Sequence, residues 1–152
     1  MPLIRPPHAA ERDGLLALWE RSVRATHHFL AEKDIAYYRP MVREFLASPL
    51  EIWVAAAETA NTPLGFMGLD IASAATLAWK LEALFVDPAR SRRGVGTLLI
   101  RHARLLKGRL DLDVNEQNPG ARAFYSRLGF VETGRSPRDG AGKPFPLIHM
   151  KG

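Results

Sequence analysis

The stretch that decides the fold reads Asp87-Pro88-Ala89-Arg90-Ser91-Arg92-Arg93-Gly94-Val95-Gly96-Thr97-Leu98-Leu99. A mainly apolar run over residues 77–86 precedes it and predicts a strand, which the proline ends because proline cannot continue a hydrogen-bonded ladder. The two glycines open a segment with the apolar spacing of a helix. A strand, a basic turn and a helix N-terminus therefore follow one another, and free N–H groups at a helix N-terminus bind phosphate oxygens.

The glycine pair is a weak signal by itself, because a tight turn that merely starts a helix has the same sequence. The phosphate-binding pattern Gly-x-x-x-x-Gly-Lys-Ser/Thr is absent, which argues against a P-loop ATPase. The dinucleotide pattern requires a third glycine where this chain has Leu99. The turn therefore predicts binding of a phosphate-bearing ligand without matching either common nucleotide fingerprint.

The segment after this helix repeats the alternation of strand and helix. Residues 110–114 (Leu-Asp-Leu-Asp-Val) alternate cleanly, which predicts a strand with one buried face. Asn118-Pro119 then opens a helix, since asparagine is favoured at the N-cap and proline at the first helical position. Gly129 ends that helix as a C-terminal cap. The passage over residues 77–114 implies a right-handed parallel crossover inside a mixed sheet.

The rest of the chain predicts one α/β domain over residues 1–152, because it contains no repeat, low-complexity tract or linker. The expected order is βααβββαβαββ. Its remaining elements are strands at 3–5, 51–56, 64–71, 130–134 and 146–151 and helices at 10–26 and 32–46.

Composition limits the function classes. The chain has no cysteine, so disulfides and thiolate sites are excluded, and it has neither a signal-peptide pattern nor a membrane-length apolar run. We therefore expect a cytoplasmic protein without a membrane partner. The net charge of +5 suits an anionic partner: nucleic acid, an acidic membrane surface or a phosphate-bearing cofactor. The histidines lack metal-ligand spacing, so no metal is expected. Asp111 and Asp113 are expected to face solvent or to pair with arginines.

The basic turn resembles the acetyl-CoA-binding motif of the GNAT (GCN5-related) N-acetyltransferases. The segment Val114-Asn115-Glu116-Gln117-Asn118, followed by Ala121-Arg122-Ala123-Phe124-Tyr125 and Leu128-Gly129-Phe130, resembles the strand–helix–strand end of the same family. Residues 22–27 with 29–30, and 133–136 with 142–144, are similar to its bacterial YjaB-type branch. Together these segments cover nearly the whole chain in the family's order.

The resemblance implies the GNAT fold: a mixed, mostly antiparallel seven-stranded sheet with a central, splayed parallel pair and about four helices. It implies an enzyme that transfers the acetyl group of acetyl-CoA to a primary amine by direct attack in a ternary complex. The acceptor is left open between a protein lysine or N-terminus and a small-molecule amine. A monomer and a homodimer are both compatible with it.

The resemblance also implies a cofactor site that combines a strand edge, the basic turn and the start of the last helix. Two residues depart from the family pattern: Ser91 stands where arginine or glutamine is usual, and Arg92 where glycine is common. The implied cofactor-binding residues are Leu84, Phe85, Val86, Ser91, Arg92, Arg93, Gly94, Val95, Gly96, Thr97, Asn118, Ala121 and Tyr125.

By the same resemblance, Tyr125 protonates the departing thiolate as general acid. The group that removes the proton of the acceptor is left open: Glu82 acting through water, or one of the histidines His27 and His149, which titrate near neutral pH. The expected acceptor-side residues are His27, Phe29, Asn115 and His149. Under the competing interpretations, Tyr125 packs in the core from one face of its helix, and the other residues have structural roles.

Two alternative functions remain at this stage. A non-catalytic acyl-CoA-binding regulatory module would keep the cofactor site without turnover. A nucleic-acid-binding protein is supported by charge alone, and no nucleic-acid-binding motif accompanies that charge. We therefore expect acetyl-CoA and an amine acceptor as partners, and no nucleic acid.

Overall fold

The computed structural model describes residues 1–90 and 93–152, and these contain seven strands and four α-helices. In chain order they are β1 (Leu3–Arg5), α1 (Arg12–Thr26), α2 (Glu32–Ala47), β2 (Glu51–Ala56), β3 (Pro63–Ser73), β4 (Ala78–Val86), α3 (Val95–Lys107), β5 (Leu110–Asn115), α4 (Pro119–Arg127), β6 (Val131–Ser136) and β7 (Leu147–Lys151). Short 3₁₀ turns, η1 (Ala9–Glu11) and η2 (Pro88–Arg90), precede α1 and α3. The expected order βααβββαβαββ is confirmed.

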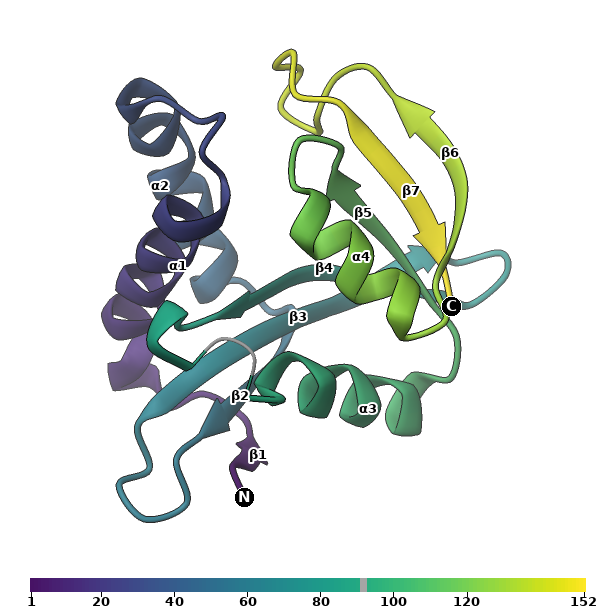
Figure 1. Ribbon diagram of the computed structural model, residues 1–152. Helices are drawn as coiled ribbons and strands as arrows, with labels where there is room; N and C mark the ends of the chain where they lie inside the picture. Colours follow the sequence, from purple (N-terminus) through teal and green to yellow (C-terminus); the bar gives the residue numbers. More distant parts are fainter. Residues whose placement is uncertain (91–92) are drawn as a thin grey trace.

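The strands form one sheet in the order β1-β2-β3-β4-β5-β7-β6. Among the described strands, only β4 and β5 pair in parallel, and the other neighbouring strands are antiparallel. Helix α3 makes the crossover between the two parallel strands. Figure 1 shows β5, β7 and β6 fanning away from β4 at the upper right. The sheet is therefore mixed and mostly antiparallel, as expected, with its parallel pair near the centre.

The parallel pair is splayed because β4 bends in its middle. Pairing between β4 and β5 ends at Leu81↔Leu112, although both strands continue. On the other side of β4, the register with β3 passes from Leu69↔Leu81 to Gly68↔Ala83, so Glu82 is an extra residue. An extra residue on one strand of an antiparallel pair bends that strand. The bulge therefore coincides with the point at which β4 and β5 part.

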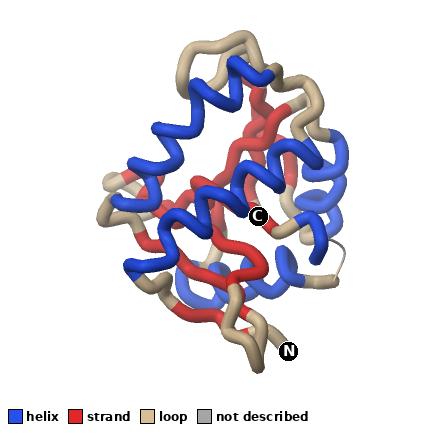
Figure 2. Tube along the Cα trace, turned by 90° about the vertical axis from the view of Figure 1, so that its left-hand side faces the viewer, coloured by secondary structure: helices blue, strands red, loops and turns tan. Residues whose placement is uncertain are grey.

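Helices cover both faces of the sheet (Figure 2), and each pair closes its own apolar cluster. Helices α3 and α4 pack on the face that presents Leu112, Val114 and Met150. Helices α1 and α2 pack against the opposite face, where Val54 and Phe66 are fully buried. The splayed strands lie between these two layers.

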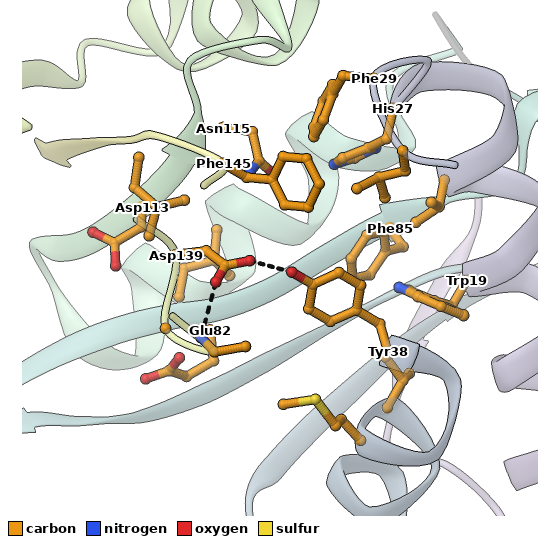
Figure 3. A pocket seen from close by; sticks show the side chains of 18 of the residues that line it. Trp19, His27, Phe29, Tyr38, Glu82, Phe85, Asp113, Asn115, Asp139 and Phe145 are labelled. Carbon is orange, nitrogen blue, oxygen red and sulfur yellow. Dashed lines mark hydrogen bonds between the residues drawn. The ribbon is translucent and has the colours of Figure 1, made fainter. Parts of the chain in front are cut away.

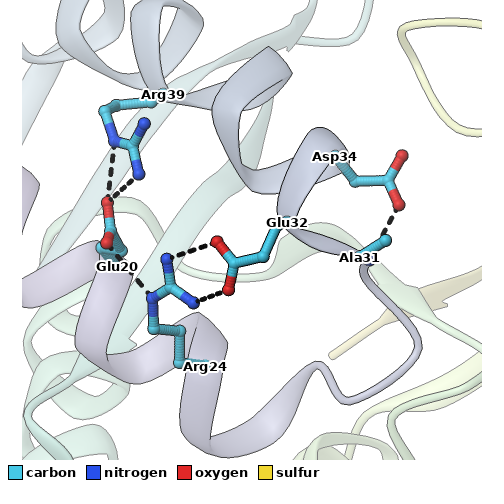
Figure 4. Close-up of polar contacts among 6 residues, drawn as sticks. All are labelled: Glu20, Arg24, Ala31, Glu32, Asp34 and Arg39. Atoms are coloured by element: carbon cyan, nitrogen blue, oxygen red, sulfur yellow. Dashed lines mark hydrogen bonds and ion pairs between the residues drawn. The ribbon is translucent and has the colours of Figure 1, made fainter.

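Polar contacts hold α1 and α2 together along their exposed side (Figure 4). Glu20 binds Arg39 and Arg24, and Arg24 also binds Glu32. The backbone N–H of Ala31 donates to the carboxylate of Asp34 at 2.9 Å. Exposed ion pairs of this kind contribute little to stability, about 0–1 kcal/mol each. The two helices, which wall the site described below, are held together mainly by the apolar cluster that they share.

A more protected ion pair joins the first strand to the start of α1. Arg5 donates two hydrogen bonds to Glu11, at 2.8 and 2.9 Å, and the two side chains are only 16% and 17% exposed. These hydrogen bonds are the largest cause that lowers the pKa of Glu11 to about 2. The carboxylate therefore stays ionised in the folded protein well below its usual pKa.

Candidate active site

The start of α3 has the geometry of an anion site. Gly94 is the N-cap residue and has φ of 81°, a left-handed conformation that favours glycine. The N–H groups of the next residues, Val95, Gly96 and Thr97, lie in the first turn, where no intrahelical acceptor exists. Arg93 precedes them and is exposed. Ser91 and Arg92 were predicted to take part, and both lie outside the described residues.

Glycine is also needed in this turn because α4 packs closely against it. A Cβ atom on Gly96 would lie 3.1 Å from Cζ of Phe124, tighter than an ordinary contact. The first turn of α3 and the second turn of α4 therefore meet without a side chain between them. This contact brings Tyr125, the next residue along α4, close to the predicted cofactor turn.

The parted strands give the predicted cofactor residues an open strand edge. Leu84, Phe85 and Val86 follow the last parallel pair, so this stretch of β4 has no ladder partner on the β5 side. Asn118 caps α4, with its side-chain oxygen accepting the N–H of Ala121 at 3.2 Å. That bond uses the amide oxygen and leaves the amide NH₂ as the polar group that can face a ligand.

Tyr125 lies on α4, among the buried apolar residues of the cluster that α3 and α4 close. Its ring is 8% exposed and packs against Phe124 and Phe130, with centroids 5.2 and 5.6 Å away. Among the residues that the structure describes, its hydroxyl makes no hydrogen bond with another side chain or with the backbone. Burial raises the pKa of the phenol above its usual value of 10. The hydroxyl is therefore protonated throughout the neutral range.

A cavity of about 390 Å³ adjoins the parted strands on the side of α1 and α2 (Figure 3). Its walls come from α1, α2, β4, β5 and the loop that precedes β7. Aromatic rings surround it and carboxylates stand among them. The aromatic residues are Trp19, Phe29, Tyr38, Phe85 and Phe145, and the carboxylates are Glu82, Asp113 and Asp139.

The bulge explains how Glu82 reaches this cavity. In a regular strand its side chain would alternate with those of Leu81 and Ala83, whereas a bulge re-aims the extra residue. Glu82 is exposed and lines the cavity beside Phe85. The carboxylate that the sequence predicted as a base therefore stands where the strands part.

His27, which directly follows α1, and Asn115 on β5 also line the cavity. The hydroxyl of Thr26 donates to the carbonyl of Ser22 at 2.8 Å, so it accepts from Nδ1 of His27, 2.7 Å away. This assigns the proton to Nδ1 and leaves the lone pair on Nε2. Burial lowers the pKa of His27 to about 4, although a hydrogen bond with the Asn115 side chain acts in the opposite direction. The imidazole is therefore neutral at pH 7 and a weak base.

His149, the other predicted histidine, is not among the residues that line the cavity. It lies on β7 opposite Asp113 on β5, and its Nδ1 hydrogen-bonds to that carboxylate. Lys80 donates to the other oxygen of Asp113 at 2.9 Å. The expectation that Asp113 faces solvent or pairs with an arginine was therefore wrong, because the adjoining strands place a lysine and a histidine beside it.

The sequence does not predict that the loop at residues 137–146 forms a wall of the cavity. Asp139 accepts the N–H groups of Ala141 and Lys143, at 3.0 and 2.9 Å, and the hydroxyl of Tyr38. Lys143 in turn donates to Asp34 of α2 at 3.0 Å. A loop tied to a distant helix by such contacts has no periodicity from which its position can be read.

The described residues contain neither a metal-binding cluster nor a membrane-spanning helix. Within residues 1–90 and 93–152, no group of three or more histidine, aspartate and glutamate side chains is arranged to hold a metal ion. In the same ranges, no helix combines the length and apolar character needed to cross a membrane.

Comparison with known proteins identifies relatives of this arrangement. The family model of the acetyltransferase (GNAT) domain matches residues 48–132. The chain is 40% identical to the peptidyl-lysine N-acetyltransferase YjaB of Salmonella typhimurium over 147 residues, 97% of this chain and 95% of that protein. It therefore shares nearly its full length with an acetyltransferase.

Solved structures agree with the sequence comparison. The solution structure of apo-form YjaB from Escherichia coli has a TM-score of 0.86 at 39% identity and covers 99% of this chain and 97% of that one. The PaiA N-acetyltransferase of Thermoplasma acidophilum, solved in complex with coenzyme A, has a TM-score of 0.78. It is only 20% identical over 99% and 98% of the two chains, so this second likeness concerns the fold alone.

Proposed function

This chain belongs to the GNAT acetyltransferase family and is an N-acetyltransferase, and we propose that it transfers the acetyl group of acetyl-CoA to the side-chain amine of lysine residues in proteins. The full-length likeness to a peptidyl-lysine N-acetyltransferase supports this acceptor. The family identity favours the enzyme over the non-catalytic and nucleic-acid-binding alternatives.

The observation that carries the acceptor proposal is the acidic and aromatic lining of the cavity. A lysine side chain combines an apolar stem with a terminal ammonium group. Rings such as Phe29 and Phe145, whose centroids are 5.5 Å apart, suit the stem and attract a cation through their faces. The carboxylate of Glu82 lies at the same cavity and suits the ammonium. Lys80 also lines the cavity, but its ammonium donates to Asp113 at 2.9 Å, which leaves the carboxylate of Glu82 to attract a cationic acceptor.

The described residues also fit acetyl-CoA as the donor, which the family uses. The open edge of β4 at Leu84–Val86 suits the amides of an extended ligand, since unpaired backbone groups require partners. The first-turn N–H groups of α3 suit a pyrophosphate, with Arg93 adding charge. Bound here, acetyl-CoA supplies an acetyl group activated as a thioester.

The residues of the chain divide the proton transfers between them. Glu82 takes the proton of the acceptor ammonium through water, which frees the nitrogen lone pair to attack. Nε2 of His27 accepts a hydrogen bond from the amine and orients it, because a pKa of about 4 makes this histidine a poor base. Tyr125, protonated because it is buried, donates its proton to the departing sulfur. His149 binds Asp113 and takes no part in this scheme.

We further propose that residues 1–152 act as a single domain, as a monomer or a homodimer, in the cytoplasm. The sheet supports the first statement, because β1 and β7 contribute strands from opposite ends of the chain to it. The absence of cysteine is compatible with a reducing compartment.

Acetylation of matched acceptors tests the lysine proposal. The acceptors are a peptide with one internal lysine and a blocked N-terminus, the same peptide with arginine in its place and a free N-terminus, and spermidine. We expect thiol release and a gain of one acetyl group, located on lysine by mass spectrometry, with the first peptide. Faster turnover of the N-terminal amine or of the polyamine would contradict the acceptor and leave the reaction class intact.

Calorimetric titration with acetyl-CoA tests the donor site. Gly94→Trp places an indole before the first turn of α3 at a residue with φ of 81°, and we expect acetyl-CoA binding to be lost. Gly108→Ala is the matched control, because it strains a left-handed glycine with φ of 76° at the other end of α3. Equal binding by both variants would contradict the proposed phosphate contact.

A further inference from the structure

Three polar side chains from adjacent strands form a hydrogen-bonded chain beside the acceptor cavity. Ser136 on β6, His149 on β7 and Asp113 on β5 project from the same face of the sheet. Oγ of Ser136 lies 2.7 Å from Nε2 of His149, and Nδ1 of His149 lies 2.5 Å from Oδ1 of Asp113. The antiparallel register fixes this arrangement, because Asp113 pairs directly with His149.

The carboxylate of Asp113 determines which group donates in each of these hydrogen bonds. Burial acts to raise the pKa of Asp113, but hydrogen bonds from His149 and Lys80 outweigh it and hold that pKa below its usual value. An ionised carboxylate only accepts, so Nδ1 of His149 carries a proton. In the neutral imidazole the lone pair is then on Nε2 and accepts the hydroxyl of Ser136. A hydroxyl, a base and a group that orients the base therefore stand in the order required of an activated nucleophile.

The hydrogen-bonded side chains Ser136, His149 and Asp113 are accessible from solvent on the side of β6. This strand is at the edge of the sheet, and the His149 side chain is 36% exposed. Gly134 pairs with His149, and even a Cβ atom there would lie 3.4 Å from Cδ2 of the ring. Because residue 134 is glycine, it places no side chain over Cδ2, the ring atom next to Nε2. Ser136 is itself partly exposed, so a small molecule can approach its hydroxyl.

We propose that Ser136, His149 and Asp113 form a second catalytic site, which hydrolyses small activated carboxylic esters. Oγ of Ser136 bonds to the acyl carbon while its proton passes to Nε2 of His149. The ester C–O bond breaks, and the alcohol leaves with that proton. Water then attacks the acyl-serine with His149 as base, which releases the carboxylic acid and restores the serine. The roles are those of a Ser-His-Asp triad.

Lys80 sets the expected rate. Its ammonium neutralises part of the charge of Asp113, 2.9 Å away, and so weakens the support that this carboxylate gives to a protonated imidazole. General base catalysis typically accelerates a reaction by about 10²–10⁴-fold. We expect a gain at the lower end of that range, well below that of a dedicated esterase.

Hydrolysis of p-nitrophenyl acetate, without acetyl-CoA, tests this site. Ser136→Ala and His149→Gln are expected to lower kcat/KM at least tenfold. Ser126→Ala, which removes an exposed hydroxyl from α4, is the matched control and should keep the wild-type value. Equal hydrolysis by the wild type and Ser136→Ala would overturn the proposal.

A second measurement uses the unchanged protein and so does not depend on how the variants fold. A fluorophosphonate probe should attach to Ser136, as located by peptide mass spectrometry, and labelling of other residues alone would overturn the proposal. Ser136→Ala should still acetylate the lysine peptide with acetyl-CoA. Failure of the esterase site is therefore distinguishable from failure of the proposed acetyl transfer.

Discussion

Tyr125→Phe is the substitution that most directly tests the proposed chemistry, because it removes one oxygen atom and leaves the packing in place. The ring contacts with Phe124 and Phe130, at centroid distances of 5.2 and 5.6 Å, are available to phenylalanine. The hydroxyl makes no protein hydrogen bond within residues 1–90 and 93–152, so its removal leaves no described partner unsatisfied.

These contacts allow the two effects of the substitution to be separated. A lost intramolecular hydrogen bond costs about 0.5–1.5 kcal/mol, and none is lost here, so we expect the free energy of unfolding to change by less than about 0.5 kcal/mol. Loss of a general acid lowers the rate by about 10²–10⁴-fold, which corresponds to a barrier increase on the order of 3–5 kcal/mol. Tyr125→Ala would be less informative, because the cavity alone costs about 3–5 kcal/mol of stability.

The assay is thiol release at saturating lysine peptide, together with calorimetric binding of acetyl-CoA. We expect kcat to fall at least a hundredfold while the Kd for acetyl-CoA changes less than threefold. Tyr37→Phe, which removes a hydroxyl from a residue 46% exposed on α2, should leave both unchanged. Because burial keeps Tyr125 protonated, its loss should lower kcat at every pH between 6 and 9. A kcat within threefold of wild type would refute the assignment.

Three further predictions follow from individual contacts. Glu82→Gln should lower kcat at least tenfold without changing the Kd for acetyl-CoA, measured as above, because it removes the proton acceptor and not the donor site. The pKa of Glu11 is lowered from 4.5 to about 2, so its ionised carboxylate contributes on the order of 3 kcal/mol to the free energy of unfolding. This contribution is complete above pH 4.5 and declines between pH 4.5 and 2. Urea unfolding at pH 6 and at pH 2.5 should therefore show a smaller loss of stability on acidification for Glu11→Gln than for the wild type. Gly68→Ala would place Cβ 2.3 Å from Cζ of Phe45, so it should lower the free energy of unfolding by about 1–3 kcal/mol and lower Tm. The control Gly14→Ala, with nothing within 4 Å of its Cβ, should raise Tm.

The element order could be predicted because local signals mark nearly every boundary. Asn118 and Pro119 open α4 as an N-cap and a first helical residue should, and the side chain of Asn118 makes the capping bond. The first helix shows the usual error: helical spacing begins at Ala10, but a 3₁₀ turn occupies Ala9–Glu11 and α1 starts at Arg12. Such ends depend on backbone hydrogen bonds, which apolar spacing does not report.

The candidate site could be predicted only where its residues lie in continuous motifs. Gly94 and Asn118 belong to such motifs, and so does Tyr125. The chain Ser136–His149–Asp113 requires the register of three strands, and the wall around Asp139 requires a contact with Tyr38, about a hundred residues earlier. Pairings over such separations leave no local periodicity. His27 lines the cavity proposed for the acceptor, but its low pKa results from tertiary burial and could not be read from its neighbours.

The bulge at Glu82 is an exception, because the sequence does carry a signal for it. In a regular strand, residues two apart share a face, yet Trp79 and Leu81 pack in the same cluster as Leu84 and Val86. The apolar residues change from odd to even positions between 81 and 84, and only an extra residue lets both sets face α3 and α4. That one residue separates β4 from β5 and turns a carboxylate toward the cavity. The opening proposed for the donor and the charge proposed for the acceptor therefore have the same origin, so a deletion that restored regular alternation at Glu82 should abolish both acetyl-CoA binding and transfer.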